Sequence, residues 1–127
     1  MGREKNITGR SGEMKALGFL KRKGYKILGT NYRTPFGELD LIAKKDDFTV
    51  FIEIKTRVTS SLGPPYLSVT KAKERHLIKN ALAYLKRYGL VDSHWRIDVV
   101  SVRLNYEHEL EDIEIIENAV EDNGGCR

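Results

Sequence analysis

The 127-residue sequence predicts one mixed α/β domain, in the order α-β-β-β-α-β with a further β segment near the C-terminus. Its length is typical of a single domain. Two stretches place apolar residues at helical spacing, and the others alternate or are rich in β-branched residues. The composition, 40% hydrophobic and 31% charged, excludes a disordered chain and a coiled-coil rod. We expect the domain to span residues 1–120 and the acidic residues 121–127 to be disordered.

The first helix is predicted to begin at a capping residue, Thr8 or Ser11, and to end near Lys23. Gly24 follows as the left-handed residue that closes the helix. The apolar residues of this segment recur at helical spacing and are expected to face the core: Met14, Leu17 and Leu20.

Three strands are expected next, over residues 25–32, 38–45 and 48–56. Pro35 and Gly37 mark a turn between the first two, because proline presets one dihedral angle and glycine tolerates a positive φ. In the second strand, Leu39, Leu41 and Ala43 are predicted to share one face.

The second half of the chain begins with a loop over residues 57–69, where serine, glycine and proline gather. Ser68 or Thr70 is expected to cap a long helix that ends near Tyr88. A strand over residues 95–104 follows, and residues 110–116 are predicted to add an edge strand.

The net charge of +4 conceals an uneven distribution along the chain. Residues 1–34 carry +7, residues 35–104 carry +4 and residues 105–127 carry −7. A basic body favours a polyanionic partner such as a nucleic acid. The alternative is an ordinary solvated surface followed by a solubilising acidic tail.

The cysteine and histidine content limits the available chemistry. The single cysteine, Cys126, excludes an internal disulfide and a metal site built from several cysteines. The three histidines show no zinc-ligand spacing. No apolar run is long enough to cross a bilayer and residues 1–10 lack the apolar core of a signal peptide, so we expect a cytoplasmic protein without a membrane partner.

The most informative segment is the hairpin around Asp46-Asp47. If these residues form a two-residue loop, Asp40 falls opposite Glu53 and Glu38 falls opposite Lys55, all on one face. Two carboxylates directly opposite one another repel.

Three arrangements would relieve this repulsion. One carboxylate could hold a proton, Lys55 could neutralise part of the charge, or Mg²⁺ or Mn²⁺ could lie between the oxygens. The cation explains most, because charged residues on an apolar and central strand are costly unless they are paired or metal-bound. The alternative is a Glu38–Lys55 ion pair with Asp40 and Glu53 at a solvated sheet edge, and a register slip of one residue would remove the pairing.

Asp40, followed by Glu53-Ile54-Lys55 on the next strand, resembles the D…(D/E)-x-K core of the restriction-endonuclease-like nucleases. Residues 10–104 as a whole resemble the YraN-like family of small bacterial proteins. That family has an endonuclease-like fold similar to archaeal Holliday-junction resolvases. The segments that carry this second resemblance are Gly12-Glu13, Gly24-Tyr25, residues 31–33, 37–43 and 50–57, Lys71 and residues 96–100.

The resemblance implies a metal-dependent endonuclease with a restriction-endonuclease-like mixed sheet flanked by helices. Asp40 and Glu53 would bind Mg²⁺ or Mn²⁺ with the backbone carbonyl of Ile54, while Lys55 orients the attacking water or stabilises charge on the phosphate. Glu13 is the candidate third acid, and an ordinary exposed helical glutamate is the alternative.

The expected partner is nucleic acid, and DNA with branches or other structure is the favoured substrate. Four basic residues are candidate phosphate contacts, although exposed basic residues are common: Arg57, Lys71, Arg33 and Lys73. A two-fold homodimer would suit cutting of two strands. A nucleic-acid-binding module without turnover and a protein-interaction adaptor are the alternatives. Asp98 shares a strand face with Arg96 and is interpreted as structural.

Overall fold

A computed structural model describes residues 3–58 and 70–120, with side chains from residue 10 onward. The expected order of elements is confirmed, and its members are α1 (Arg3–Arg22), β1 (Lys26–Thr34), β2 (Gly37–Lys45), β3 (Phe48–Val58), α2 (Lys71–Arg87), β4 (Trp95–Leu104) and β5 (Leu110–Ile116). The loop predicted over residues 57–69 begins too early, because β3 continues to Val58; its residues 59–69 and the predicted disordered tail over 121–127 lie outside the described residues. Among the described residues, no helix is long and apolar enough to span a membrane.

The five strands form one sheet in the spatial order β1-β2-β3-β4-β5. The pairs β1–β2, β2–β3 and β4–β5 are antiparallel, and β3 and β4 pair in parallel. Because α2 lies between β3 and β4 in the sequence, it provides the crossover that a parallel pair requires. The predicted central position of residues 48–56 and the edge strand over 110–116 are both confirmed.

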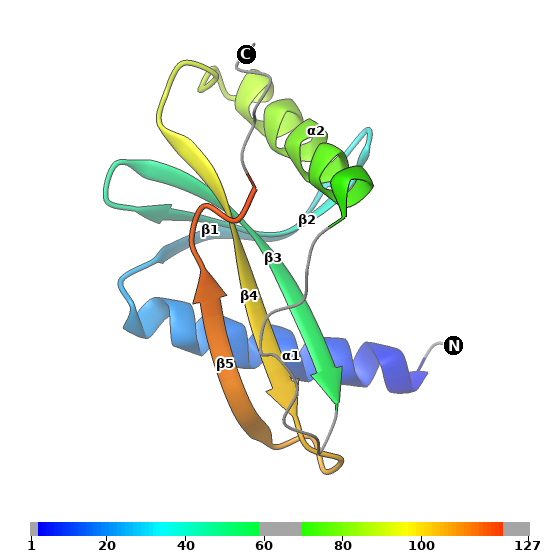
Figure 1. Ribbon diagram of the computed structural model, residues 1–127. Helices are drawn as coiled ribbons and strands as arrows, with labels where there is room; N and C mark the ends of the chain where they lie inside the picture. The colour runs from blue at the N-terminus through cyan, green and yellow to red at the C-terminus, as the bar shows by residue number, and fades with distance from the viewer. Residues whose placement is uncertain (1–2, 59–69, 121–127) are drawn as a thin grey trace.

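The two helices cover opposite faces of the sheet, α1 behind it and α2 over its upper part in the view of Figure 1. Alternate residues of β3 accordingly enter two separate cores, with Ile52 on the α1 side and Phe51 on the α2 side. The buried members on the α1 side include Ala16, Leu20, Leu41, Val100 and Val102, and those on the α2 side include Ile42, Leu77, Ala81, Leu85 and Ile97.

The face of α1 that packs on the sheet differs from the predicted one. Met14 is 69% exposed, so its predicted place in the core is wrong; Gly12, Ala16 and Leu20 face the sheet instead. A Cβ added at Gly12 would collide with the side chain of Thr56, so glycine allows the helix to lie directly against β3. The predicted start at Thr8 or Ser11 is also wrong, because both lie inside the helix. Small residues on the buried face explain the error, since hydrophobicity ranks Met14 above them.

The other helix boundaries follow the expected local chemistry. Gly24 has a φ of 93°, which confirms the left-handed residue after α1. Thr70 caps α2, and its side chain accepts a hydrogen bond from the backbone N–H of Lys73 at 3.1 Å. Tyr88 follows the last turn of α2 as its C-cap.

Asp98 lies on β4, fully buried, at the centre of a network of donors. Its carboxylate accepts hydrogen bonds from Arg96 Nε (3.0 Å), the Tyr25 hydroxyl (3.1 Å) and the backbone N–H of Asn118 (2.8 Å). Burial raises the pKa of Tyr25 to about 12, and the neighbouring Asp98 carboxylate adds to this shift. The network joins the start of β1, β4 and the segment after β5, which confirms the structural interpretation of Asp98.

Candidate functional site

The β2–β3 hairpin has the predicted two-residue loop. Lys45 pairs with Phe48, and the register continues without a shift to Leu41 and Ile52. Asp46 in the loop has a φ of 53°, a conformation that aspartate adopts more readily than most residues. The hairpin therefore brings Asp40 and Glu53 to the point where the regular pairing of the two strands ends.

At that point the side chain of Asp40 takes over the role of a strand-pairing group. Its Oδ2 accepts a hydrogen bond from the backbone N–H of Ile54 at 2.8 Å. Beyond Asp40 the alternation of β2 changes, because Leu39 packs on the α2 side while Leu41 packs on the α1 side. The prediction that Leu39 shares a face with Leu41 and Ala43 is therefore wrong, since β2 bends at Asp40.

The bend also separates Glu38 from the site. Glu38 is exposed and lies opposite Arg33 of β1 in the sheet register. The predicted pairing of Glu38 with Lys55 is therefore wrong. Lys55 instead lies beside Glu53, with 3.7 Å between its Nζ and Glu53 Oε2. The alternative that relied on a Glu38–Lys55 ion pair is excluded with it.

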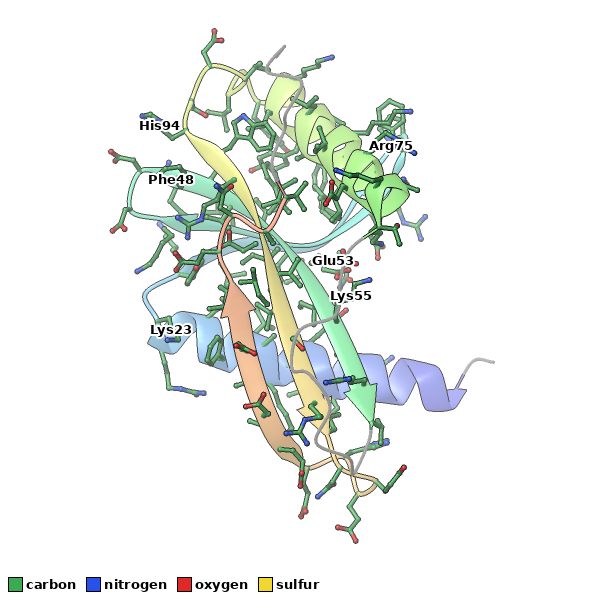
Figure 2. All side chains as sticks on the ribbon, viewed as in Figure 1. Lys23, Phe48, Glu53, Lys55, Arg75 and His94 are labelled. Atoms are coloured by element: carbon green, nitrogen blue, oxygen red, sulfur yellow. The ribbon has the colours of Figure 1, made fainter. Side chains whose placement is uncertain are left out.

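Glu53 is a buried carboxylate on the central strand, with 8% of its surface exposed. It forms ion pairs with two lysines, and the shorter one joins its Oε2 to Lys73 Nζ of α2 at 3.1 Å. Figure 2 shows Glu53 and Lys55 next to each other on β3, below the first turn of α2. Lys73 was predicted as a phosphate contact, and the structure places it within the acidic site itself.

Among the side chains that the structure describes, no cation forms an ion pair with Asp40 as Lys73 does with Glu53. Burial raises the pKa of its carboxyl to about 7, and the negative charges of Glu53 and Glu13 add to this shift. The N–H of Ile54 and the charge of Lys73 act in the opposite direction without cancelling it. The charge of Glu13, on α1, therefore acts on Asp40 from a second element. The close contact of Gly12 with Thr56 explains how α1 comes so near the strand.

The residues fit a divalent cation that keeps most of its water. Mg²⁺ prefers oxygen ligands and is commonly bound by one or two carboxylates plus a substrate phosphate. Asp40 and Glu53 supply two such carboxylates, and burial of Asp40, with the added charges of Glu53 and Glu13, raises the pKa of its carboxyl. Within the described residues, no group of three or more His, Cys, Asp or Glu side chains is placed so that it could hold a metal ion, so Asp40 and Glu53 would need water or a phosphate to complete the site.

The remaining predicted phosphate contacts are spread over α2, β3 and β1. Lys71, in the first turn of α2, has a side chain that is 79% exposed, with 3.9 Å between its Nζ and Glu74 Oε1. Arg57 lies further along β3, half-buried and beside Arg103 of β4 in the parallel register. Arg33 is exposed near the end of β1.

Two contacts of the site were not predicted from the sequence. The Lys73–Glu53 ion pair depends on how α2 packs on the sheet, which no local pattern encodes. The bond from Ile54 to Asp40 replaces the ladder pair that a regular hairpin would continue. The sequence did contain an indication of the Ile54–Asp40 hydrogen bond, because two acids opposite one another disfavour continued pairing of the strands.

The fold and the hairpin define a mixed α/β protein consistent with a restriction-endonuclease-like core, with an acidic pair and a lysine on its central strands. The chain belongs to the uncharacterised protein family UPF0102, whose family model matches residues 12–102. This is the YraN family, so the resemblance noted from the sequence is confirmed.

Relatives in this family match nearly the whole chain. A UPF0102 protein of Caldicellulosiruptor saccharolyticus is 43% identical over 115 residues, covering 91% of this chain and 98% of the relative. Another, of Desulfosudis oleivorans, is 45% identical over 115 residues, covering 91% and 90%. A third, of Pelobacter propionicus, is 44% identical over 116 residues, covering 90% and 82%.

Proposed function

We propose that the protein is a metal-dependent endonuclease that hydrolyses phosphodiester bonds in DNA, with branched or otherwise structured DNA as the favoured substrate. The observation that carries the proposal is the meeting of Asp40, Glu53 and Lys55 where the β2–β3 pairing ends. Asp40 is a buried carboxyl with two further acids, Glu53 and Glu13, acting on it, which favours a divalent cation over a purely structural ion pair.

Asp40 and Glu53 would hold Mg²⁺ or Mn²⁺, with the Ile54 carbonyl as a further ligand. When bound, such a cation polarises the phosphate and lowers the pKa of a coordinated water. The hydrogen bond from the Ile54 N–H fixes one oxygen of Asp40, which keeps the carboxylate oriented before a ligand arrives. Glu13 would add negative charge near the same position and help retain the cation.

The two lysines have complementary roles in this proposal. Lys55 is 30% exposed and lies beside Glu53, where its ammonium group can stabilise charge that develops on the phosphate. Lys73 is 37% exposed and comes from a different element. It neutralises Glu53 in the free protein and is close enough to contact an incoming phosphate. Arg57 near the end of β3 and Lys71 at the start of α2 would add further positive charge.

A cleavage assay tests the proposal directly. The purified protein is incubated with duplex, single-stranded and branched DNA and with RNA, in Mg²⁺, Mn²⁺ or a chelator. We expect metal-dependent cleavage of DNA. Asp40→Ala and Glu53→Ala should each lower the rate at least about 100-fold, equivalent to about 2.7 kcal/mol of the barrier.

Glu38→Ala is the matched control, because it removes a carboxylate from the same hairpin that lies outside the site. It should leave cleavage within about twofold of the wild type. Absence of cleavage on every substrate, with salt-sensitive binding retained, would replace the nuclease with a binding module that lacks turnover. Absence of binding as well would leave the protein-interaction adaptor.

A further inference from the structure

A second concave feature lies away from the acidic hairpin, between the end of β1 and the second half of α2. It is a pocket of about 400 Å³, within the range of roughly 300–1,000 Å³ that small-molecule sites occupy. Its lining residues are Tyr32, Arg33, Thr34, Pro35, Ala83, Lys86 and Arg87.

The pocket is strongly positive. Three of its seven lining residues are cations, and the lining contains no carboxylate. Lys86 and Arg87 occupy the last turn of α2 and are exposed. The negative end of the helix dipole stabilises their positive charges without neutralising them as an ion pair would. An anionic ligand is therefore favoured over a neutral or cationic one.

An aromatic group lies along the same wall. The Tyr32 ring lines the pocket and packs edge-to-face on Tyr84, with 5.2 Å between the ring centroids. Tyr84 in turn contacts Tyr88, whose surface is 52% exposed, at 4.7 Å between centroids. The guanidinium of Arg87 lies 5.8 Å from the centre of the Tyr88 ring. Cations and aromatic rings thus alternate on one surface.

The walls of the pocket are held together by contacts between the β1–β2 turn and α2. The Thr34 hydroxyl hydrogen-bonds the side chain of Asn80, which is fully buried. Gly37, with a φ of 147°, lies so close to α2 that an added Cβ would come within 2.7 Å of His76 Nε2. The pocket is therefore preformed, which lowers the entropic cost of ligand binding.

We infer that this pocket is a second, non-catalytic site that binds a nucleotide unit of a single-stranded nucleic acid. Lys86, Arg87 and Arg33 would hold the phosphates, and the base would stack against Tyr32. Proteins that bind single strands combine a positive groove with aromatic side chains in this manner. Lys73 and Lys86 are separated by about 20 Å along α2 at 1.5 Å per residue, so the pocket is distinct from the acidic hairpin.

The inference goes beyond the proposed nuclease and is tested without cleavage. Binding of a short fluorescein-labelled oligothymidine is followed by fluorescence anisotropy in a chelator, at several salt concentrations. Lys86→Ala/Arg87→Ala should weaken binding at least about tenfold and reduce the slope of log K against log salt by about 1.4. The chelator withholds the cation that cleavage would need, so loss of this site is measured independently of loss of cleavage.

A charge-matched control removes two lysines elsewhere. Lys26 and Lys44 are exposed partners across β1 and β2, at the end of that strand pair remote from the pocket. Lys26→Ala/Lys44→Ala should change the affinity less than threefold. An equal loss of affinity in both double variants would reduce the pocket to part of a general basic surface and overturn the inference.

Two further measurements identify the ligand and its position. Photocrosslinking of a bromouridine-substituted oligonucleotide should label Tyr32 or Tyr88, read by mass spectrometry, and exclusive labelling elsewhere would contradict the assignment. Thymidine monophosphate and inorganic phosphate should compete only weakly with the oligonucleotide. If either binds as tightly as the oligonucleotide, the pocket is a site for a small free anion and the strand-binding inference fails.

Discussion

Asp98 and Asp40 are both aspartates on the same sheet, but their surroundings differ. Asp98 is fully buried and accepts hydrogen bonds from a guanidinium, a phenol and a backbone N–H. Asp40 accepts a hydrogen bond from the N–H of Ile54, and burial, together with the charges of Glu53 and Glu13, raises the pKa of its carboxyl to about 7. A carboxylate with a full set of donors stabilises the fold, whereas one that the fold leaves undercompensated is available for a ligand.

The largest expected loss of stability comes from removing Asp98, the aspartate with the full set of hydrogen-bond donors. Asp98→Ala should destabilise the protein by about 3 kcal/mol, because it leaves the partly buried guanidinium of Arg96 without its counter-ion and the Asn118 N–H without its acceptor. Urea unfolding followed by circular dichroism measures the loss. Little change in unfolding free energy would mean that the network contributes nothing net, and the distinction between the two aspartates would fail.

Removing the charge of Asp40 should change the free energy of unfolding in the opposite direction. Asp40→Asn keeps an oxygen acceptor for the Ile54 N–H and removes the negative charge, so the metal-free protein should become more stable at pH 8. The gain is on the order of 2–4 kcal/mol, from a shift of about three pKa units. A loss of stability at pH 8 would show that the charge of Asp40 is well compensated.

The pH dependence supplies the internal control for this variant. The pKa of Asp40 is raised in the folded state, so the carboxyl favours folding below its ordinary value of 3.8. That contribution is lost as the pH rises through about 7. The stability difference between Asp40→Asn and the wild type should therefore grow from near zero at pH 4 to its full value at pH 8. Unfolding curves across this range measure it.

The smallest expected effect concerns Glu13, which adds less to the shift of Asp40 than burial or Glu53 does. Glu13→Gln should stabilise the metal-free protein at pH 8 by less than about 1 kcal/mol. The matched variant Glu38→Gln, on the exposed part of the hairpin, should leave the pH dependence unchanged. Identical pH profiles for the two variants would remove Glu13 from the acidic site.

Local chemistry determined most of what the sequence predicted correctly. The two-residue loop at Asp46-Asp47 fixed the hairpin register, because the length of a hairpin loop determines which residues of the two strands pair. Gly24 and Thr70 likewise acted through their own backbone and side-chain preferences. The family followed from the spacing of several such segments.

The incorrect predictions depended on contacts between distant elements. Met14 was placed in the core because the helical period fixes a stripe but not which of several stripes faces the sheet. Glu38 was placed opposite Lys55 because a regular ladder was assumed beyond Asp40. The meeting of Lys73 with Glu53 required the position of α2, which the packing of its apolar side on β2 and β3 determines.

The bond between Ile54 and Asp40 has a consequence for the choice of residue at position 40. The side chain at position 40 would have to bind a cation and also accept the hydrogen bond from Ile54 that joins β2 to β3. The distance between the two strands therefore determines how long that side chain can be. Glutamate would keep the charge but exceed that length by one methylene group. Asparagine would keep the hydrogen bond to Ile54 but not the negative charge. Aspartate satisfies both demands, and assembling the hairpin therefore also assembles the candidate site.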